Sequence, residues 1–319
     1  EDVSVVSVDD IALAAYASPA LTTVRPPFED MGRAAALRLI AQIEGHDAIG
    51  DMPSTHRELY VSLAAVAANT SRIAFGPGVT NPLTRDPSVT ASAIATLAEF
   101  SDGRAFLGLG AGDSALHNAG LHPAKVRDVA DYAAAVQSLW RTGAARFQDR
   151  DLKLGWRPEP TPILLLIAAH GPRMLAMAGQ LADGVIAGNG LTGDAVRAAD
   201  ERIDAGARAV DRDPAAIARW RLSMVNVHDD RATALAEIAT PLAALGNLLV
   251  RAGLDHAGIP RALTSAFEEL VARYDYGAHA SGIAAGANAR LITELGLLDY
   301  LADRFAVAGT GPEIAHRIK

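Results

Sequence analysis

Glycine-rich turns follow four apolar segments of the sequence, and glycine at such positions is suited to holding a ligand. The turns read GPGVTNP, GLGAGDS, AAHGP and GVIAGNG, and each begins where an apolar predicted strand ends. Glycine lacks a Cβ, so its backbone N–H can approach a ligand closely, and a helix N-terminus that follows favours bound phosphate. One such turn is most often purely structural. Because four such turns occur at equivalent positions, a binding site explains them as well as a purely structural role does.

The GLGAGD segment is not a dinucleotide-binding fingerprint, although it is rich in glycine. Its glycines are Gly108, Gly110 and Gly112, so the third comes too early for the GxGxxG spacing. Asp113 follows directly and would place a negative charge beside a pyrophosphate. The segment also does not lie in the first strand–helix unit, and the sequence contains no Walker motif.

Apolar strands alternate with helices along most of the chain. The predicted strands cover 3–9, 47–51, 72–79, 105–111, 163–169, 183–190 and 219–228, and the predicted helices cover 28–45, 58–70, 87–101, 126–143, 172–182 and 194–210. Strands joined by helices of this length run parallel. Two α/β architectures fit, a closed eightfold barrel and a doubly wound open sheet. The segment 147–162 is a polar excursion, and the chain from residue 231 is nearly all helical, with a break at 257–260.

Composition and charge exclude several classes of protein. The 319 residues carry 29 Lys and Arg against 37 Asp and Glu, a formal net charge of −8, so we expect no binding of nucleic acid. The absence of cysteine excludes disulfides, thiolate metal sites and a cysteine nucleophile. No apolar run approaches the roughly 20 residues of a membrane span, and the acidic N-terminus lacks a signal-peptide pattern. We therefore expect a cytoplasmic protein with no membrane partner.

Three long segments resemble the luciferase-like monooxygenase superfamily. They are 51–114 (DMPSTHREL through GLGAGDS), 167–192 (IAAHGPRMLAMAGQLADGVIAGNGLT) and 304–318 (RFAVAGTGPEIAHRI). The branch they resemble is that of the methylenetetrahydromethanopterin reductase-like enzymes, which use F420 or FMN. The resemblance spans about 47–319. It implies a (βα)8 TIM barrel with the cofactor at the C-terminal mouth, and hydride transfer between that cofactor and a small-molecule substrate.

The resemblance also implies which residues form the cofactor site. A non-prolyl cis peptide between Gly78 and Val79 would lie behind the cofactor ring, and Thr80 and Asn81 would face its edge. The segments 170–172 and 188–190 would form turns near the cofactor phosphate. The remaining contacts implied are Asp51, Gly110, Ala111, Gly112, Asp113, Ser114, His170, Gly171, Pro172, Gly188, Asn189 and Gly190.

Asp113 is the candidate catalytic residue, because members of the family often carry an acid near the reactive ring carbon at the matching position. A carboxylic acid there can protonate or deprotonate the atom that reacts with the hydride. Asp113 and Ser114 fit a helix N-cap equally well. Asp51 and His56, each taken alone, fit a solvated or capping role better than a functional one.

Two histidines and two tryptophans near these segments carry a weaker signal. His117 and His122 follow Asp113 and can line the mouth of the barrel, but their spacing indicates no metal site. Trp140 and Trp156 fit packing better than ring stacking. We therefore assign no metal to this sequence.

Residues 1–46 resemble a different family, the C-terminal part of the effector-binding domain of LacI/GalR-type repressors. The matching residues are DVSVV, DDI and PALTTVRPPFEDMGRAA. Only a fragment of that domain is present, so the resemblance transfers neither sugar nor DNA binding. The segments 3–9, 28–45 and 47–51 form a predicted β–α–β unit, and we expect it to replace the first unit of the barrel in a natural or engineered chimera.

The sequence stops short of the strand that ends the family barrel. We therefore expect either an open barrel or a substitute strand such as 21–24. The main function hypothesis is a flavin- or F420-dependent oxidoreductase, with Asp113 favouring F420 slightly over FMN. The alternatives are a non-catalytic chimeric scaffold that binds cofactor weakly and, with least support, a sugar-binding regulator fragment. The alanine-rich helices are suited to packing in a homodimer.

Overall fold

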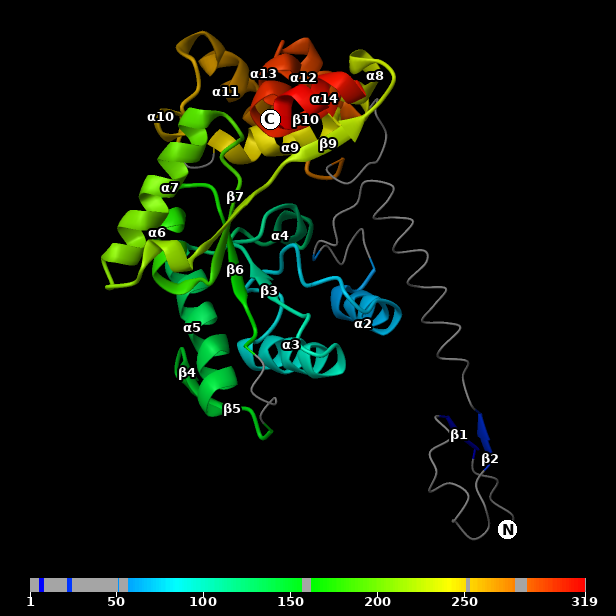
Figure 1. Ribbon diagram of the computed structural model, residues 1–319, viewed down its shortest axis with the longest axis vertical. Helices are drawn as coiled ribbons and strands as arrows, with labels where there is room; N and C mark the ends of the chain where they lie inside the picture. Colours follow the sequence, from blue (N-terminus) through cyan, green and yellow to red (C-terminus); the bar gives the residue numbers. More distant parts are fainter. Residues whose placement is uncertain are drawn as a thin grey trace.

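The centre of the fold is a parallel four-stranded sheet. The computed structural model describes residues 6–8, 22–24, 51, 57–156, 162–250, 253–278 and 286–318 (Figure 1). The sheet contains, in spatial order, β3 (Leu107–Leu109), β6 (Leu165–Ala169), β7 (Gly184–Ala187) and β8 (Ala218–Arg221). The spatial order is the chain order, as in a barrel, whereas a doubly wound sheet reverses its order at the centre. This order favours the barrel architecture.

Helices between the strands bury apolar faces against the sheet. They are α2 (Leu59–Asn69), α3 (Pro87–Phe100), α5 (Val126–Thr142), α6 (Pro172–Leu181) and α7 (Gly193–Arg208). All five confirm predicted helices to within two residues at each end. Local signals explain this agreement: Asp86 accepts a hydrogen bond from the Ser88 N–H at the start of α3, and Gly143 ends α5 in the left-handed conformation.

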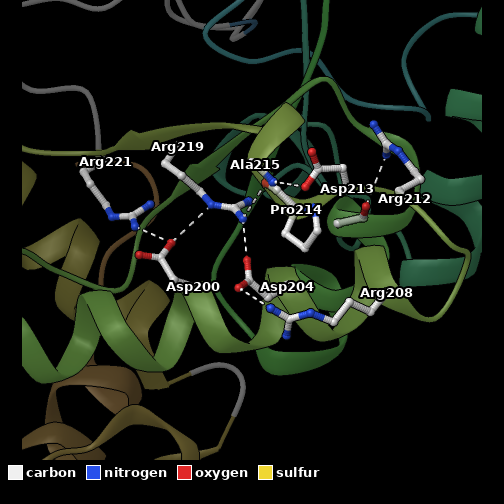
Figure 2. Close-up of polar contacts among 10 residues, drawn as sticks. Asp200, Asp204, Arg208, Arg212, Asp213, Pro214, Ala215, Arg219 and Arg221 are labelled. Carbon is white, nitrogen blue, oxygen red and sulfur yellow. Dashed lines mark hydrogen bonds and ion pairs between the residues drawn. The ribbon is translucent and has the colours of Figure 1, made fainter.

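Helix α7 is fixed to both of its neighbours. Glycines allow α6 and α7 to touch, because a Cβ on Gly206 would lie 1.9 Å from the Ala176 carbonyl oxygen. On the other side, Arg219 of β8 lies 2.6 Å from Asp204 of α7, and Arg221 lies 2.6 Å from Asp200 (Figure 2). The acids stand four residues apart and so share one face of the helix. Charge pairs therefore set the position of β8 along α7.

The sheet is strongly curved. Trp220, which lies between the two arginines of β8, has its ring centroid 6.4 Å from that of Phe106, just before β3. Since β3 and β8 are the outer strands of the four, side chains from opposite edges meet on the inner face. This curvature agrees with a barrel-type sheet.

Two predicted strands differ from the structure. The predicted strand 72–79 forms no ladder in the structure: Phe75 bridges Ala105, and Thr80, just after the predicted range, bridges Leu109. Pro77, between them, has no N–H to donate to a ladder. The predicted strand 219–228 is divided into β8 and β9 (Met224–Val227), and β9 pairs with β10 (Ala306–Gly309). The prediction of a nearly all-helical C-terminal part was wrong for β10.

The predicted polar excursion begins with an antiparallel hairpin that sequence analysis did not predict. Its strands are β4 (Ala144–Phe147) and β5 (Arg150–Lys153). Phe147 packs its ring edge-on to that of Tyr132 in α5, with 6.0 Å between the centroids. Leu152 and Ala145 of the hairpin also pack against the core around the sheet, so apolar contacts within a polar stretch anchor the hairpin.

The C-terminal helices form a second hydrophobic cluster, separate from the one around the sheet. The helices are α8 (Arg231–Glu237), α9 (Ala239–Leu249), α10 (Leu254–Ala257), α11 (Thr264–Arg273), α12 (Ala287–Glu294) and α13 (Leu298–Phe305), and α14 (Gly311–Ile318) follows them in the chain. Figure 1 shows them gathered at one end of the molecule, away from α3 and α5. In the described ranges no single helix is long and apolar enough to cross a membrane; α8 and α9 reach that length only as a pair bent by 61°.

Near the N-terminus, the described residues form one short parallel pair. β1 (Val6–Val8) pairs with β2 (Thr22–Val24), so the short strand predicted near 21–24 exists. In the described part of the chain, β2 pairs with β1 and with no strand of the main sheet. The predicted helix 28–45 and residues 47–50 lie outside the described residues, so the β–α–β unit stays a prediction.

Candidate cofactor site

A backbone bulge beside β3 confirms one specific prediction, since the Gly78–Val79 peptide is cis. The Thr80 N–H donates to the Gly108 carbonyl over 3.0 Å, and the Gly110 N–H donates to the Thr80 carbonyl over 2.9 Å. A Cβ on Gly108 would lie 2.0 Å from the Pro77 carbonyl oxygen, and one on Gly110 would lie 2.8 Å from Val79 Cγ2. These glycines therefore make room for the bulge, a role that sequence analysis did not assign to them.

Asp51 lies beneath this bulge and is buried. Its Oδ2 accepts a hydrogen bond from the Thr80 hydroxyl over 2.6 Å and lies 3.1 Å from an Arg85 nitrogen. Arg85 also pairs with Glu58 and lies 4.6 Å above the ring of Tyr60. The interpretation of Asp51 as a solvated or capping residue was therefore wrong. His56, which shared that interpretation, lies outside the described residues.

Two tyrosines, Tyr60 and Tyr132, lie behind Asp51 and Thr80, with their hydroxyl groups buried. Tyr132 and Thr90 share a hydrogen bond of 2.6 Å. Burial raises the pKa of Tyr132 far above its ordinary value of 10, and burial likewise raises the pKa of Tyr60. Both hydroxyl groups therefore stay protonated at physiological pH.

The turns around the bulge use their polar groups internally. Asn81 is buried, and its Oδ1 accepts from the N–H groups of Leu83 and Thr84 over 3.0 and 3.1 Å. Gly112 has φ of +79°, and a Cβ there would lie 2.4 Å from a methyl of Leu116. These contacts give both residues a structural role in shaping the turns.

Asp113 begins α4 (Ser114–Asn118) at the N-cap position. Its backbone carbonyl accepts from the N–H groups of Leu116 and His117, but its side chain makes no capping hydrogen bond. The carboxylate instead lies 3.9 Å from His117 Nε2. The N-cap interpretation is therefore right for the backbone and wrong for the side chain. Ser114 is buried at the first helical position.

A second group of predicted residues interlocks at the ends of β6 and β7. Gly171 is the N-cap of α6 and Pro172 its first residue, and no described side chain caps this helix. His170 Nδ1 lies 3.0 Å from the Gly188 carbonyl oxygen, and a Cβ on Gly188 would lie 2.0 Å from the imidazole. The Asn189 amide donates to the His170 carbonyl over 2.5 Å. The two turns thus hold each other in place.

Arg304 of α13 completes this second group, and sequence analysis did not identify it. Its buried side chain donates to the carbonyls of Asn189 (2.9 Å) and Ala257 (2.6 Å) and to the Tyr300 hydroxyl (2.8 Å). Gly190 has φ of +111°, and a Cβ there would lie 2.6 Å from Arg304 Cγ. Arg304 therefore joins the turn after β7 to the C-terminal helices.

The two groups are adjacent, because β3 and β6 are neighbours and a Cβ on Gly110 would lie 3.6 Å from that of Ala168. All of these turns follow parallel strands, the edge at which α/β folds bind ligands. The Asn189 Oδ1 is buried and has no hydrogen-bond partner among the described residues. This oxygen is an acceptor and fits an N–H or hydroxyl donor of a ligand, whereas the start of α6 and the glycine turns fit a flat ring that carries a phosphate. No group of His, Asp or Glu suited to a metal occurs in the described residues.

Trp140 and Trp156 lie where packing or surface roles suit them. Trp140 donates from its indole N–H to the Ala91 carbonyl over 3.0 Å, between α5 and α3. Trp156 is exposed. Neither lies among the turns that form the candidate site.

Comparison with known proteins agrees with this geometry. Residues 31–319 match the luciferase-like monooxygenase family, and residues 1–60 match the periplasmic binding protein-like domain. The 5,10-methylenetetrahydromethanopterin reductase of Methanolobus tindarius is 30% identical over 275 residues, 82% of this chain and 78% of its own. The F420-dependent hydroxymycolic acid dehydrogenase of Mycobacterium tuberculosis is 35% identical over 190 residues, 56% of this chain and 51% of its own.

Solved structures show the same fold. The F420-dependent tetrahydromethanopterin reductase of Methanopyrus kandleri superposes with a TM-score of 0.64 at 23% identity, covering 82% of this chain and 78% of that one. An F420-dependent secondary alcohol dehydrogenase gives 0.61 at 14% identity, covering 92% and 85%. The α/β fold is thus that of luciferase-like TIM-barrel proteins, and the chain belongs to the luciferase-like monooxygenase family.

Proposed function

We propose that this chain is an oxidoreductase that uses F420 to transfer a hydride to or from a small organic substrate. The observation that carries the proposal is the Gly78–Val79 bulge, framed by Gly108 and Gly110 and buttressed by Asp51 through Thr80. A backbone surface framed by glycines suits the flat face of a ring. We favour F420 over FMN because three of the similar proteins described above are named as F420-dependent enzymes.

The residues divide between the ring and the cofactor's anionic end. Val79 and Thr80 would support the ring face, with Gly110, Ala111 and Gly112 beside it. The turns 170–172 and 188–190 would hold the phosphate, since the uncapped start of α6 offers backbone N–H groups. When bound, F420 supplies the hydride acceptor or donor.

Asp113 would donate or accept the proton that accompanies the hydride. It lies at the end of the β3 segment, next to the glycine turn, and its carboxylate is not used as a helix cap. A positioned carboxyl group can give a proton to the substrate oxygen in one direction and take it in the other. Asp51 is held by Thr80 and Arg85, so we assign it a supporting role under the bulge.

A fluorescence titration tests the proposal. The purified full chain is titrated with F420 and, separately, with FMN. We expect a saturable change with F420 and a weaker response in a Gly110→Ala variant, whose added methyl presses on Val79. Saturation with FMN alone would reject the cofactor assignment. No response to either cofactor would favour the alternative of a non-catalytic scaffold.

We also propose that residues 1–46 complete the barrel as its first strand–helix unit. The match of residues 1–60 to a periplasmic binding protein-like domain supports a borrowed segment. Deleting residues 1–46 should then lower the thermal midpoint and abolish cofactor binding. A deletion variant with unchanged midpoint would contradict this role. Sedimentation of the full chain would test the proposed homodimer.

A further inference from the structure

We propose that His117 is a positioning residue that orients Asp113 and exchanges protons between its carboxylate and solvent. The inference rests on the proposed function of Asp113. His117 lies one helical turn after Asp113, and its Nε2 is 3.9 Å from Asp113 Oδ1. Residues four apart on a helix face the same side. The two groups are therefore placed for an ion pair whenever the imidazole is protonated.

The two side chains differ in their access to water. The Asp113 side chain is 17% exposed, but both of its carboxylate oxygens are buried, so the exposure lies on its carbon. The His117 side chain is 24% exposed. A carboxylate that turns over protons needs a path to solvent, and His117 is the titratable group that provides one.

The proton transfer balances without any further reactant. The imidazolium of His117 gives up its Nε2 proton, and that proton forms the O–H bond on Asp113 Oδ1, either directly after a small side-chain movement or through one water. The neutral imidazole then takes a proton from solvent. In the opposite direction of the reaction, the same steps return a proton from Asp113 to water.

The C-terminal part of the chain holds the imidazole in place. The ring of His117 stacks on Tyr276 with centroids 4.2 Å apart and planes at 29°. The Tyr276 hydroxyl accepts a hydrogen bond from Asn247 of α9 over 3.1 Å, and the Tyr274 ring meets Tyr276 edge-on at 5.0 Å. The stack therefore fixes the direction of the imidazole beside Asp113.

Few other ionisable groups face His117 in the described residues. The ring of His122 approaches edge-on at 6.1 Å and is the second histidine of this surface. The Asp275 carboxylate lies on the neighbouring segment, but it accepts from the N–H groups of Gly277 and Ala278 and so is turned into its own loop. Asp113 is the carboxylate that pairs with His117 from one helical turn away, so we expect the titration of His117 to depend on it.

The first experiment needs neither cofactor nor substrate. The ring proton signals of the histidines are followed by NMR against pH in the full chain, with His117→Gln and His122→Gln for assignment. In Asp113→Asn, the titration midpoint of His117 should move to lower pH, because the charged partner is lost, while that of His122 should move less. An unchanged midpoint for His117 would overturn the pairing, whatever the outcome of the F420 titration.

The second experiment uses the F420-loaded protein and a substrate that it converts at a measurable rate. His117→Gln should lower kcat roughly tenfold to a hundredfold, with little change in KM, as expected when a proton-transfer step is slowed. Added imidazole should restore part of the rate, and the matched His122→Gln variant should keep the full rate. Loss of rate without rescue by imidazole, or an unaltered pH profile in His117→Gln, would reject proton exchange through His117.

Discussion

Replacing Gly108 with alanine should damage the bulge more than replacing Gly110 with alanine. The new Cβ would lie 2.0 Å from the Pro77 carbonyl oxygen, and ordinary contact begins at about 3.4 Å. The atom in the way belongs to the backbone, so no side-chain rotation relieves the overlap. Pro77 must move, and Val79, whose Cγ1 would lie 3.1 Å from the same Cβ, must yield as well.

The geometry gives a graded series. Overpacking a rigid site costs about 1–3 kcal/mol and occasionally more, so Gly108→Ala should cost about 3 kcal/mol or more. In Gly110→Ala the obstacle is a methyl of Val79 at 2.8 Å, which can yield, and we expect about 1–2 kcal/mol. Gly155→Ala is the matched control, because nothing lies within 4 Å of its added Cβ. It should change stability by less than about 0.5 kcal/mol.

Urea unfolding followed by circular dichroism measures the series, and the F420 titration is run on each variant below the transition. Stability and affinity should fall in the order Gly155→Ala, Gly110→Ala, Gly108→Ala. If Gly108→Ala were as stable as Gly155→Ala, the close approach of β3 to the bulge would be wrong. If Gly108→Ala were destabilised but bound F420 normally, the bulge would not be part of the cofactor site.

Three further predictions follow from buried polar groups. Tyr132→Phe should cost about 1 kcal/mol of unfolding free energy at neutral pH, because it loses a buried hydrogen bond. Burial raises the folded-state pKa of Tyr132, so the wild type should lose stability as pH rises above about 10. Unfolding at several pH values should show a smaller loss for the variant. Arg304→Met should cost about 2–4 kcal/mol by leaving buried carbonyls unpaired, and should weaken F420 binding; a variant with unchanged thermal midpoint would contradict this. Asp51→Asn should cost about 1–2 kcal/mol through loss of the charged partner of Arg85, a loss that should disappear in an Arg85→Met background.

Helices were predictable where their ends carry local signals. The Asp86–Pro87 pair and Gly143 mark ends that depend on a few neighbouring residues, and the structure places them as expected. Strands were less predictable, because a ladder exists only with its partner. The bulge at Gly78 interrupts one predicted strand, and β10 was missed because its partner β9 lies 82 residues away in sequence, from Ala306 to Met224.

The candidate site was predictable from resemblance more than from pattern. The cis bond at Gly78–Val79 was implied by the resemblance and is present. The two arginines that support the site were missed, because their acceptors are distant in sequence. Arg85 reaches an acid 34 residues away, and Arg304 reaches a carbonyl 115 residues away. No spacing rule relates such positions, whereas the fold brings them together.

The C-terminal helices matter to this site through two contacts of different kinds. Arg304 ties α13 to the turn after β7 by hydrogen bonds, and Tyr276 holds His117 beside Asp113 by ring stacking. Both contacts join turns at the edge of the main sheet to the part of the chain that holds the second hydrophobic cluster. A ligand that contacts the turn 188–190 and lies beside Asp113 would therefore engage residues that both clusters position. Such a ligand should stabilise the C-terminal helices as well as the sheet, since binding favours every element needed to form its site.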